Sequence, residues 1–198
     1  MTDVAIIDNG GANIASLRHA LERLGARSTL ATSAAELASA PRVLLPGVGA
    51  AADAMSRLRA LDLVEAIRAL KQPVLGICLG MQLLFDRSDE GDTQCLGLID
   101  ARVRRFDDAP GLPVPHMGWN RIEASREDAL LAGLKRGEHV YFVHSYRAPV
   151  GPWTVATTDY GGEFSAVVRR GNFAGAQFHP ERSGPAGARL LANFLAAA

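Results

Sequence analysis

The chain has few cysteines and no excess of charge of either sign. Only two cysteines occur among its 198 residues, Cys78 and Cys95, and no metal-type CxxC pair is present. Such sparse cysteines do not suggest a disulfide framework, so we expect a reducing, cytoplasmic setting. Lysine and arginine together number 21, as do aspartate and glutamate. With no basic stripe, the sequence does not predict nucleic-acid binding.

Long hydrophobic runs, internal repeats and low-complexity linkers are also absent. The first residues, MTDVAIIDNGG, carry Asp3 and Asp8 around a short apolar stretch, which predicts neither a signal peptide nor a membrane span. Hydrophobic residues make up 48% of the chain and charged residues 21%, which is typical of a globular enzyme. We therefore expect one domain over residues 1–198 with a full core.

Strand-like and helical patterns alternate through the first half of the chain. Strands are expected at 4–8, about 28–31, 42–47 and 73–77. Helical spacing follows them at 14–24, at 33–38, between about 51 and 70, and at 79–87. Gly25 is expected to stop the first of these helices, and Ser33 and Glu36 have the spacing of a capping box. This alternation predicts a parallel sheet covered by helices on both faces.

The second half reads mainly as strands. Strand-like runs lie at 96–106, 113–124, 139–148, 153–161 and 164–179, before a closing helix at 185–198. We expect a three-layer α/β fold of flavodoxin-like type, with a mostly parallel central sheet and an antiparallel extension. Ligands should gather at the carboxyl ends of the parallel strands, where Cys78 and the PGVG loop at 46–49 both fall.

The stretch GICLGMQ places Cys78 between Gly76 and Gly80, where a strand ends and a helix begins. Glycines on either side relieve crowding in such a tight turn, and the same geometry presents the serine of α/β-hydrolases. The dipole of a helix N-terminus favours thiolate, the nucleophilic form of cysteine. The alternative is a small buried core cysteine, and a nucleophile would also need a base.

Of the five histidines, His179 is the best candidate for that base. His19, His116, His139 and His144 have adequate structural explanations, on a helix face or at strand ends. Proline at 180 favours an extended His179, which would place its side chain on the same face as that of Glu181. A carboxylate there would orient the imidazole, giving a Cys–His–Glu triad. Alone, Glu181 could equally be a surface acid.

The glycine-rich PGVG turn exposes backbone N–H groups after a buried strand, although it could be a simple structural turn. It lacks the Lys-Ser/Thr of a nucleotide P-loop, which excludes that mode of ATP binding. The donors best placed for an oxyanion are the N–H of Leu79, just after the candidate nucleophile, and one from Val48 or Gly49.

Together, GICLGMQ, HPE and PGVG resemble the class I (triad) glutamine amidotransferases. With PHMGWN at 115–120, YFVHSY at 141–146 and HPERS at 179–183, essentially the whole chain is similar to the glutaminase subunits of imidazole glycerol phosphate synthases. The resemblance implies that Cys78 attacks the side-chain amide of L-glutamine, with His179 and Glu181 completing the triad and with no cofactor or metal. By motif position it assigns the holding of glutamine to Gly49, Gln82, Glu90, His144, Ser145 and Tyr146.

The resemblance also implies a partner, a (β/α)₈-barrel cyclase subunit in a heterodimer of histidine biosynthesis. The partner would receive ammonia through an internal channel and form imidazole glycerol phosphate and an aminoimidazole carboxamide ribotide. Partner binding would gate the glutaminase through reorientation of the PGVG peptide. Interface positions by motif are Asn13, Trp119, Asn120 and Arg182, although core packing is an alternative role for Trp119.

Some positions depart from the family pattern. Asn9 and Ala12 stand where the family has an aromatic residue and a glycine, and Arg182 stands where lysine is more frequent, which alters hydrogen-bond donation while retaining charge. Cys95 matches no functional position and reads as structural.

Three other functions remain open. These are another class I glutaminase subunit, a cysteine peptidase or amidase on the same scaffold, and a binding subunit that has lost the chemistry. The last should have lost a triad residue, and none is missing here.

Overall fold

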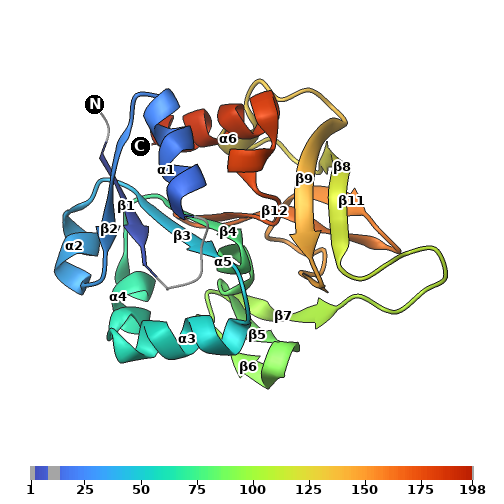
Figure 1. Cartoon of the computed structure of the whole chain (residues 1–198), viewed down its shortest axis with the longest axis horizontal. Helices are drawn as coiled ribbons and strands as arrows, with labels where there is room; N and C mark the ends of the chain where they lie inside the picture. Colours follow the sequence, from blue (N-terminus) through green and yellow to red (C-terminus); the bar gives the residue numbers. More distant parts are fainter. Residues whose placement is uncertain (1–2, 9–13, 198) are drawn as a thin grey trace.

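The computed structural model describes residues 3–8 and 14–197 (Figure 1). Its centre is a mixed sheet of nine strands within those residues. In spatial order the strands are β2 (Arg27–Ala31), β1 (Asp3–Ile7), β3 (Val43–Gly47), β4 (Val74–Cys78), β13 (Phe173–Ala176), β12 (Glu163–Arg170), β11 (Thr154–Asp159), β8 (His116–Ala124) and β9 (Glu138–His144). Strands β2, β1, β3, β4 and β13 pair in parallel, and the rest pair antiparallel. The predicted parallel centre with an antiparallel extension is confirmed.

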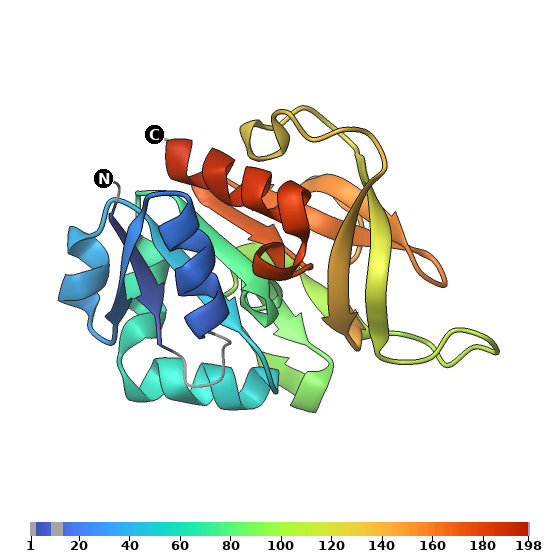
Figure 2. The ribbon, with the colours of Figure 1, turned by 45° about the horizontal axis from the view of Figure 1, so that its top comes forward.

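Helices cover both faces of the parallel strands, so the predicted layers are present (Figures 1 and 2). The helices are α1 (Ile14–Arg23), α2 (Ala34–Ser39), α3 (Ala51–Ala60), α4 (Leu63–Ala69), α5 (Leu79–Gln82) and α6 (Gly184–Ala196). Helices α1 and α6 lie on one face, and α3 and α4 lie on the other. The stop at Gly25 and the capping box of Ser33 and Glu36 are both observed.

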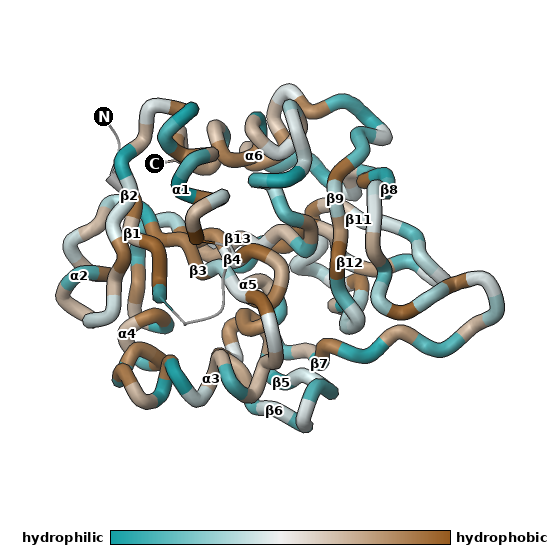
Figure 3. The backbone as a smooth tube through the Cα atoms, in the orientation of Figure 1, coloured by the Kyte–Doolittle hydropathy of each residue, from teal (hydrophilic) through white to brown (hydrophobic). Residues whose placement is uncertain are grey.

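The inner parallel strands β1, β3 and β4 are apolar on both sides and pack against helices on each, whereas the edge strand β2 is largely exposed. In β1, Val4 and Ile6 join one cluster of buried residues, whereas Ala5 and Ile7 join the other. Successive side chains of a strand point to opposite faces, so an uninterrupted apolar strand serves two cores. The hydropathy colouring follows this pattern along β1, β3 and β4 (Figure 3).

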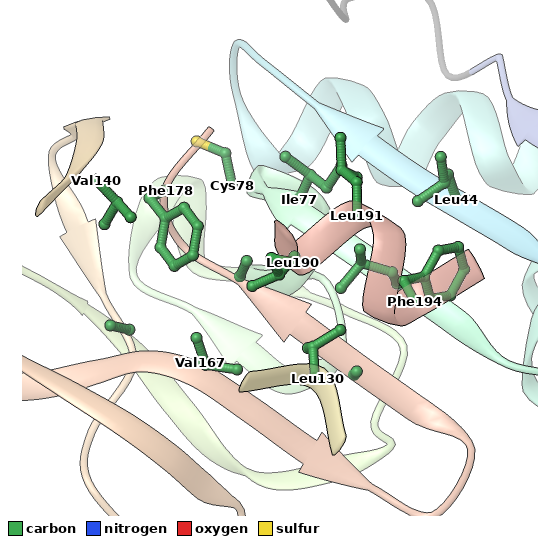
Figure 4. Close-up of a cluster of buried hydrophobic side chains, with 14 of the residues drawn as sticks. Leu44, Ile77, Cys78, Leu130, Val140, Val167, Phe178, Leu190, Leu191 and Phe194 are labelled. Atoms are coloured by element: carbon green, nitrogen blue, oxygen red, sulfur yellow. The ribbon is translucent and has the colours of Figure 1, made fainter. Parts of the chain in front are cut away.

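The closing helix α6 buries Leu190, Leu191 and Phe194 against the sheet. Figure 4 shows Cys78 at one edge of this cluster, beside Phe178. The apolar core therefore fixes the carboxyl end of β4, where Cys78 lies.

The expected helix at 79–87 is wrong beyond its first turn. Helix α5 ends at Gln82, and the chain continues into strand β5 (Phe85–Ser88). Residues 79–85 are all buried, and the carbonyl groups of 83–85 accept N–H groups from residues 96–99. This tertiary pairing competes successfully with helical hydrogen bonding, which local propensity alone cannot anticipate.

Strand β5 belongs to a second, small sheet that flanks α5. In order, its strands are β10 (Tyr146–Arg147), β7 (Ile99–Arg105), β5 and β6 (Thr93–Gln94). Short 3₁₀ turns complete the described elements: η1 (Glu90–Asp92), η2 (Ala129–Leu131) and η3 (Pro180–Arg182).

The expected helical segment at 51–70 is divided in two. Asp62 adopts a left-handed conformation with φ 54° between α3 and α4, which aspartate tolerates better than most residues. Within residues 3–8 and 14–197, no helix combines the length and apolar character needed to cross a bilayer.

Candidate active site

Cys78 lies at the expected junction of strand and helix, and its backbone is strained. Its φ of 53° and ψ of −112° fall outside the regions that non-glycine residues normally occupy. Strain of this kind concentrates at functional sites, where the surrounding structure holds it. The sharp turn directs the side chain out of the line of β4, as in a nucleophile elbow.

The two glycines beside Cys78 allow the backbone segments to approach closely. A Cβ at position 80 would lie 1.7 Å from the carbonyl oxygen of Leu45, and one at position 76 would lie 2.6 Å from that of Gly80. Gly47 serves the same purpose, because its Cβ would lie 2.9 Å from the Cβ of Leu79. The elbow therefore requires glycine because α5 contacts β3 and β4 closely, and none of these three glycines has a positive φ.

His179 and Glu181 are in contact, although by a different route from the one expected. The Nδ1 of His179 lies 2.9 Å from Oε1 of Glu181. His179 is extended, with φ −95° and ψ 100°, but Glu181 lies in the η3 turn instead of on a strand. The turn packs tightly against α6, since a Cβ at Gly187 would lie 1.9 Å from the carbonyl oxygen of Pro180.

The environment of His179 favours its protonated form. Burial alone would lower the pKa of the imidazole, but Cys78 and Glu181 together outweigh it and raise the pKa to about 10. Nε2 of His179 is buried and has no hydrogen-bond partner among the described residues. The Cys78 sulfur therefore raises the pKa of the ring from beyond hydrogen-bond distance. The ring therefore holds a proton at neutral pH and has one nitrogen free for chemistry.

A cavity of about 450 Å³ brings most of the predicted site residues together. It is lined by Val48, Gly49, Cys78, Leu79, Gln82, Glu90, Pro115, Val143, His144, Ser145, Tyr146, His179, Glu181 and Arg182. All predicted triad, oxyanion and glutamine-holding positions are among them. Within the described part of the chain, no group of three His, Cys, Asp or Glu residues is placed to hold a metal ion.

Gln177 is a site residue that the sequence analysis missed. It is completely buried, its Nε2 lies 3.8 Å from the Cys78 sulfur, and its Oε1 accepts a hydrogen bond of 3.0 Å from Nε2 of Gln82. A signal was available, because Gln177 precedes His179 by two residues in an extended segment, and the side chains of i and i+2 share a face.

The loops around the cavity are tied together by Glu90. Its Oε2 accepts a 2.7 Å hydrogen bond from the N–H of Ala51, at the start of α3. In the loop that Glu90 contacts, Gly49 has φ +90°, a conformation that favours glycine, and no atom lies within 4 Å of an added Cβ.

The predicted partner positions lie largely outside the cavity. Trp119 is 56% exposed on β8, so the alternative role of core packing is wrong. The Arg182 guanidinium, at the rim of the cavity, stacks over the ring of Tyr141 at 4.5 Å. Asn120 belongs to β8, while Asn13, Asn9 and Ala12 lie outside the described residues.

Known proteins resemble this chain over nearly its whole length. Residues 5–198 match the family model described as "Glutamine amidotransferase class-I". The imidazole glycerol phosphate synthase subunit HisH of Xanthomonas euvesicatoria pv. vesicatoria is 60% identical, covering 98% of both chains. The chain belongs to the class I glutamine amidotransferases and, within them, to the HisH subunits. HisH of Xylella fastidiosa (strain Temecula1) is 54% identical over the same share of both chains.

Solved structures show the same amidotransferase fold at low sequence identity. One described as a glutamine amidotransferase aligns with a TM-score of 0.75 and 21% identity, covering 98% of this chain and 97% of the other. The structure of PurLQS from Thermotoga maritima aligns with a TM-score of 0.71 and 19% identity, covering 98% of both chains. These likenesses support the α/β class assigned from the sequence.

Proposed function

We propose that this chain hydrolyses L-glutamine to glutamate and ammonia as the glutaminase subunit of an imidazole glycerol phosphate synthase in histidine biosynthesis. The chain belongs to the HisH subunits, and this membership supports the proposal. The observation that carries the chemistry is one cavity containing the strained Cys78 and a buried His179 whose Nδ1 is bound to Glu181.

The thiol proton of Cys78 passes to Nε2 of His179, the sulfur attacks the side-chain carbonyl carbon of glutamine, and the carbonyl oxygen becomes an oxyanion. The N–H of Leu79, at the start of α5, and one from Val48 or Gly49 stabilise that charge. Nε2 of His179 then gives its proton to the departing nitrogen, because Nδ1 is occupied by Glu181. The carbon–nitrogen bond breaks, ammonia leaves, and a γ-glutamyl thioester remains on Cys78.

The second half of the reaction uses the same imidazole as a base. Nε2 takes a proton from water, the resulting hydroxide attacks the thioester carbon, and the carbon–sulfur bond breaks to release glutamate. Glutamine is held at the cavity wall by Gly49, Gln82, Glu90 and the 144–146 segment, all of which line it. Glu181 keeps Nε2 directed at the reacting atoms in both halves.

The ammonia passes to a second polypeptide, a (β/α)₈-barrel cyclase that forms a heterodimer with this chain. Four positions, Asn13, Trp119, Asn120 and Arg182, are proposed to face it. The exposed Trp119, with Met117 67% exposed on the same strand, supports a protein-binding surface on β8.

Glutamate release from glutamine tests the proposal. The chain is assayed alone, with the cyclase, and with the cyclase plus its nucleotide ligand. We expect strong release only in the third mixture and none detectable with Cys78→Ala, because that variant lacks the attacking sulfur.

The matched control is Cys95→Ala, which removes a cysteine that is buried away from the cavity. Burial raises the pKa of the Cys95 thiol to about 11, so it is inert at neutral pH, and this variant should retain activity. Full activity of the chain alone would indicate a different amidotransferase, and cleavage of casein would indicate a peptidase.

A further inference from the structure

Two buried histidines at the cavity have side chains that transfer no proton in the proposed chemistry, although the backbone around His144 lines the glutamine site. His116 begins β8 and His144 ends β9, and the two residues are paired in the sheet. Only 3% of His116 and 6% of His144 are exposed, and Nδ1 of His116 lies 3.0 Å from Nε2 of His144. Burial lowers the pKa of His116 to about 4 and that of His144 to about 3, so both rings are neutral at physiological pH.

The outer contacts of this pair determine which nitrogens carry hydrogen. The amide nitrogen of Asn120 can only donate, and it lies 3.3 Å from Nε2 of His116. Nε2 is therefore the acceptor, and Nδ1 of His116 carries the hydrogen that it donates to His144. Nδ1 of His144 must then be its protonated nitrogen, which fits its 2.8 Å contact with the carbonyl oxygen of Tyr146.

The Asn120 amide is itself held in one orientation. Its Oδ1 accepts a hydrogen bond from the N–H of Arg121 at 2.8 Å, and its Nδ2 also donates to the carbonyl oxygen of Asp159 at 2.9 Å. A flipped amide would place two donors or two acceptors face to face. The direction of every hydrogen bond from Asn120 to Tyr146 is thus fixed.

The chain of hydrogen bonds continues to the reactive sulfur. Nε2 of Gln82 donates to the same Tyr146 oxygen at 2.9 Å and to Oε1 of Gln177 at 3.0 Å, and Gln177 lies against the Cys78 sulfur. The chain of hydrogen bonds therefore runs from strand β8, which carries the exposed Trp119, to the centre of the cavity.

Aromatic packing keeps the His116 ring in place. The ring stacks on Phe142 at 4.8 Å and on Tyr160 at 4.1 Å, with interplanar angles of 26° and 23°. Because the ring is held on both faces, it cannot turn to compensate for a change in either neighbour.

We propose that His116 is a positioning residue for the glutamine pocket. Together with Asn120, His116 fixes the tautomer of His144. The Nδ1–H of His144 then holds the Tyr146 carbonyl in the orientation that accepts the Gln82 amide at the cavity wall. A substitution of Asn120 on β8 therefore alters the orientation of the hydrogen-bonding groups that bind glutamine. This inference rests on the proposed function and deepens it.

The sharpest test is Asn120→Asp, which keeps the size of the side chain and replaces the donor with an acceptor. Histidine ring tautomers are read from ¹⁵N chemical shifts of labelled protein. We expect hydrogen on Nδ1 of both rings in the wild type. In the variant we expect hydrogen on Nε2 of His116, because that nitrogen now faces a carboxylate, and loss of hydrogen from Nδ1 of His144.

The functional readout is alkylation of Cys78 by a diazoketone analogue of glutamine, measured by mass spectrometry with the cyclase and its ligand bound. Loss of one ordered hydrogen bond should raise the inhibition constant about tenfold, with a smaller effect on the maximal alkylation rate. His116→Phe, which keeps the stacking but removes both ring nitrogens, should do the same, and His116→Asn should restore part of the affinity through its own donor. His139→Phe, at an exposed position on β9, is the control that should change neither reading.

Two results would overturn the proposal. One is hydrogen on Nε2 of either ring in the wild type, and the other is an altered tautomer in Asn120→Asp with an unchanged inhibition constant. Failure of the wild type to react with the diazoketone at Cys78 would instead overturn the proposed function, whatever tautomers the spectra show.

Discussion

Replacement of Gly80 by alanine is expected to destabilise the protein by about 4 kcal/mol or more, an effect at the extreme of single substitutions. In an ordinary helix the same change would stabilise by about 1 kcal/mol. Here the added Cβ would lie 1.7 Å from the carbonyl oxygen of Leu45, in the buried centre of β3. Neither backbone can move without displacing the sheet. Urea unfolding measures the free energy difference, and loss of glutaminase activity should accompany it.

Gly171→Ala is the matched control for this substitution. Gly171 lies between β12 and β13 with φ +59° and no atom within 4 Å of an added Cβ, so only conformational strain of about 1 kcal/mol is expected. If Gly80→Ala and Gly171→Ala were equally stable, close contact between α5 and β3 would not be what requires glycine at position 80.

Glu181→Gln is expected to lower the rate of glutamine hydrolysis by about 10² to 10⁴-fold, because the amide no longer fixes the imidazole for proton transfer. The Glu181 side chain is 4% exposed and bonds Nδ1 of His179 at 2.9 Å, so solvent cannot replace it. Burial lowers the pKa of His179 and the Glu181 carboxylate raises it, so removing the carboxylate should make that pKa fall from about 10. Titration of labelled histidine by NMR measures that shift directly.

The same pair makes stability depend on pH in a definite direction. The pKa of His179 in the folded protein lies above its ordinary value of about 6.5. The stabilisation of the folded state by protonated His179 is therefore fully present below pH 6.5 and is lost as pH rises through about 10. Glu181→Gln should therefore lose less stability than the wild type between pH 7 and pH 10. Glu163→Gln, an exposed acid on β12, should behave as wild type. A wild-type His179 that titrates near pH 6.5 would contradict this explanation.

The main elements could be predicted because their signals are local. The uninterrupted apolar strands, the glycine at position 25 and the capping box of Ser33 need little knowledge of the rest of the chain. The end of α5 could not be predicted in this way. Residues 83–85 leave the helix because residues 96–99 supply their hydrogen-bond partners, and that pairing exists only in the folded protein.

The candidate site shows the same division. The pattern HPE indicated the contact of His179 with Glu181 but not the 3₁₀ turn that forms it. Neither Gln177 nor the pairing of His116 with His144 was recognised, because buried polar partners are far apart in sequence. Gln177 reaches Gln82 across 95 positions, and His116 reaches His144 across 28.

The position of β13 has a consequence for synthesis of the protein. This strand, from residues 173 to 176, lies between β4 and β12, so the centre of the main sheet is completed by a segment near the end of the chain. Before residues 173–179 have been synthesised, one edge of β4 is unpaired and Cys78 lacks His179. Until then the nascent chain exposes an unpaired strand edge, which favours aggregation, and the proposed triad is incomplete.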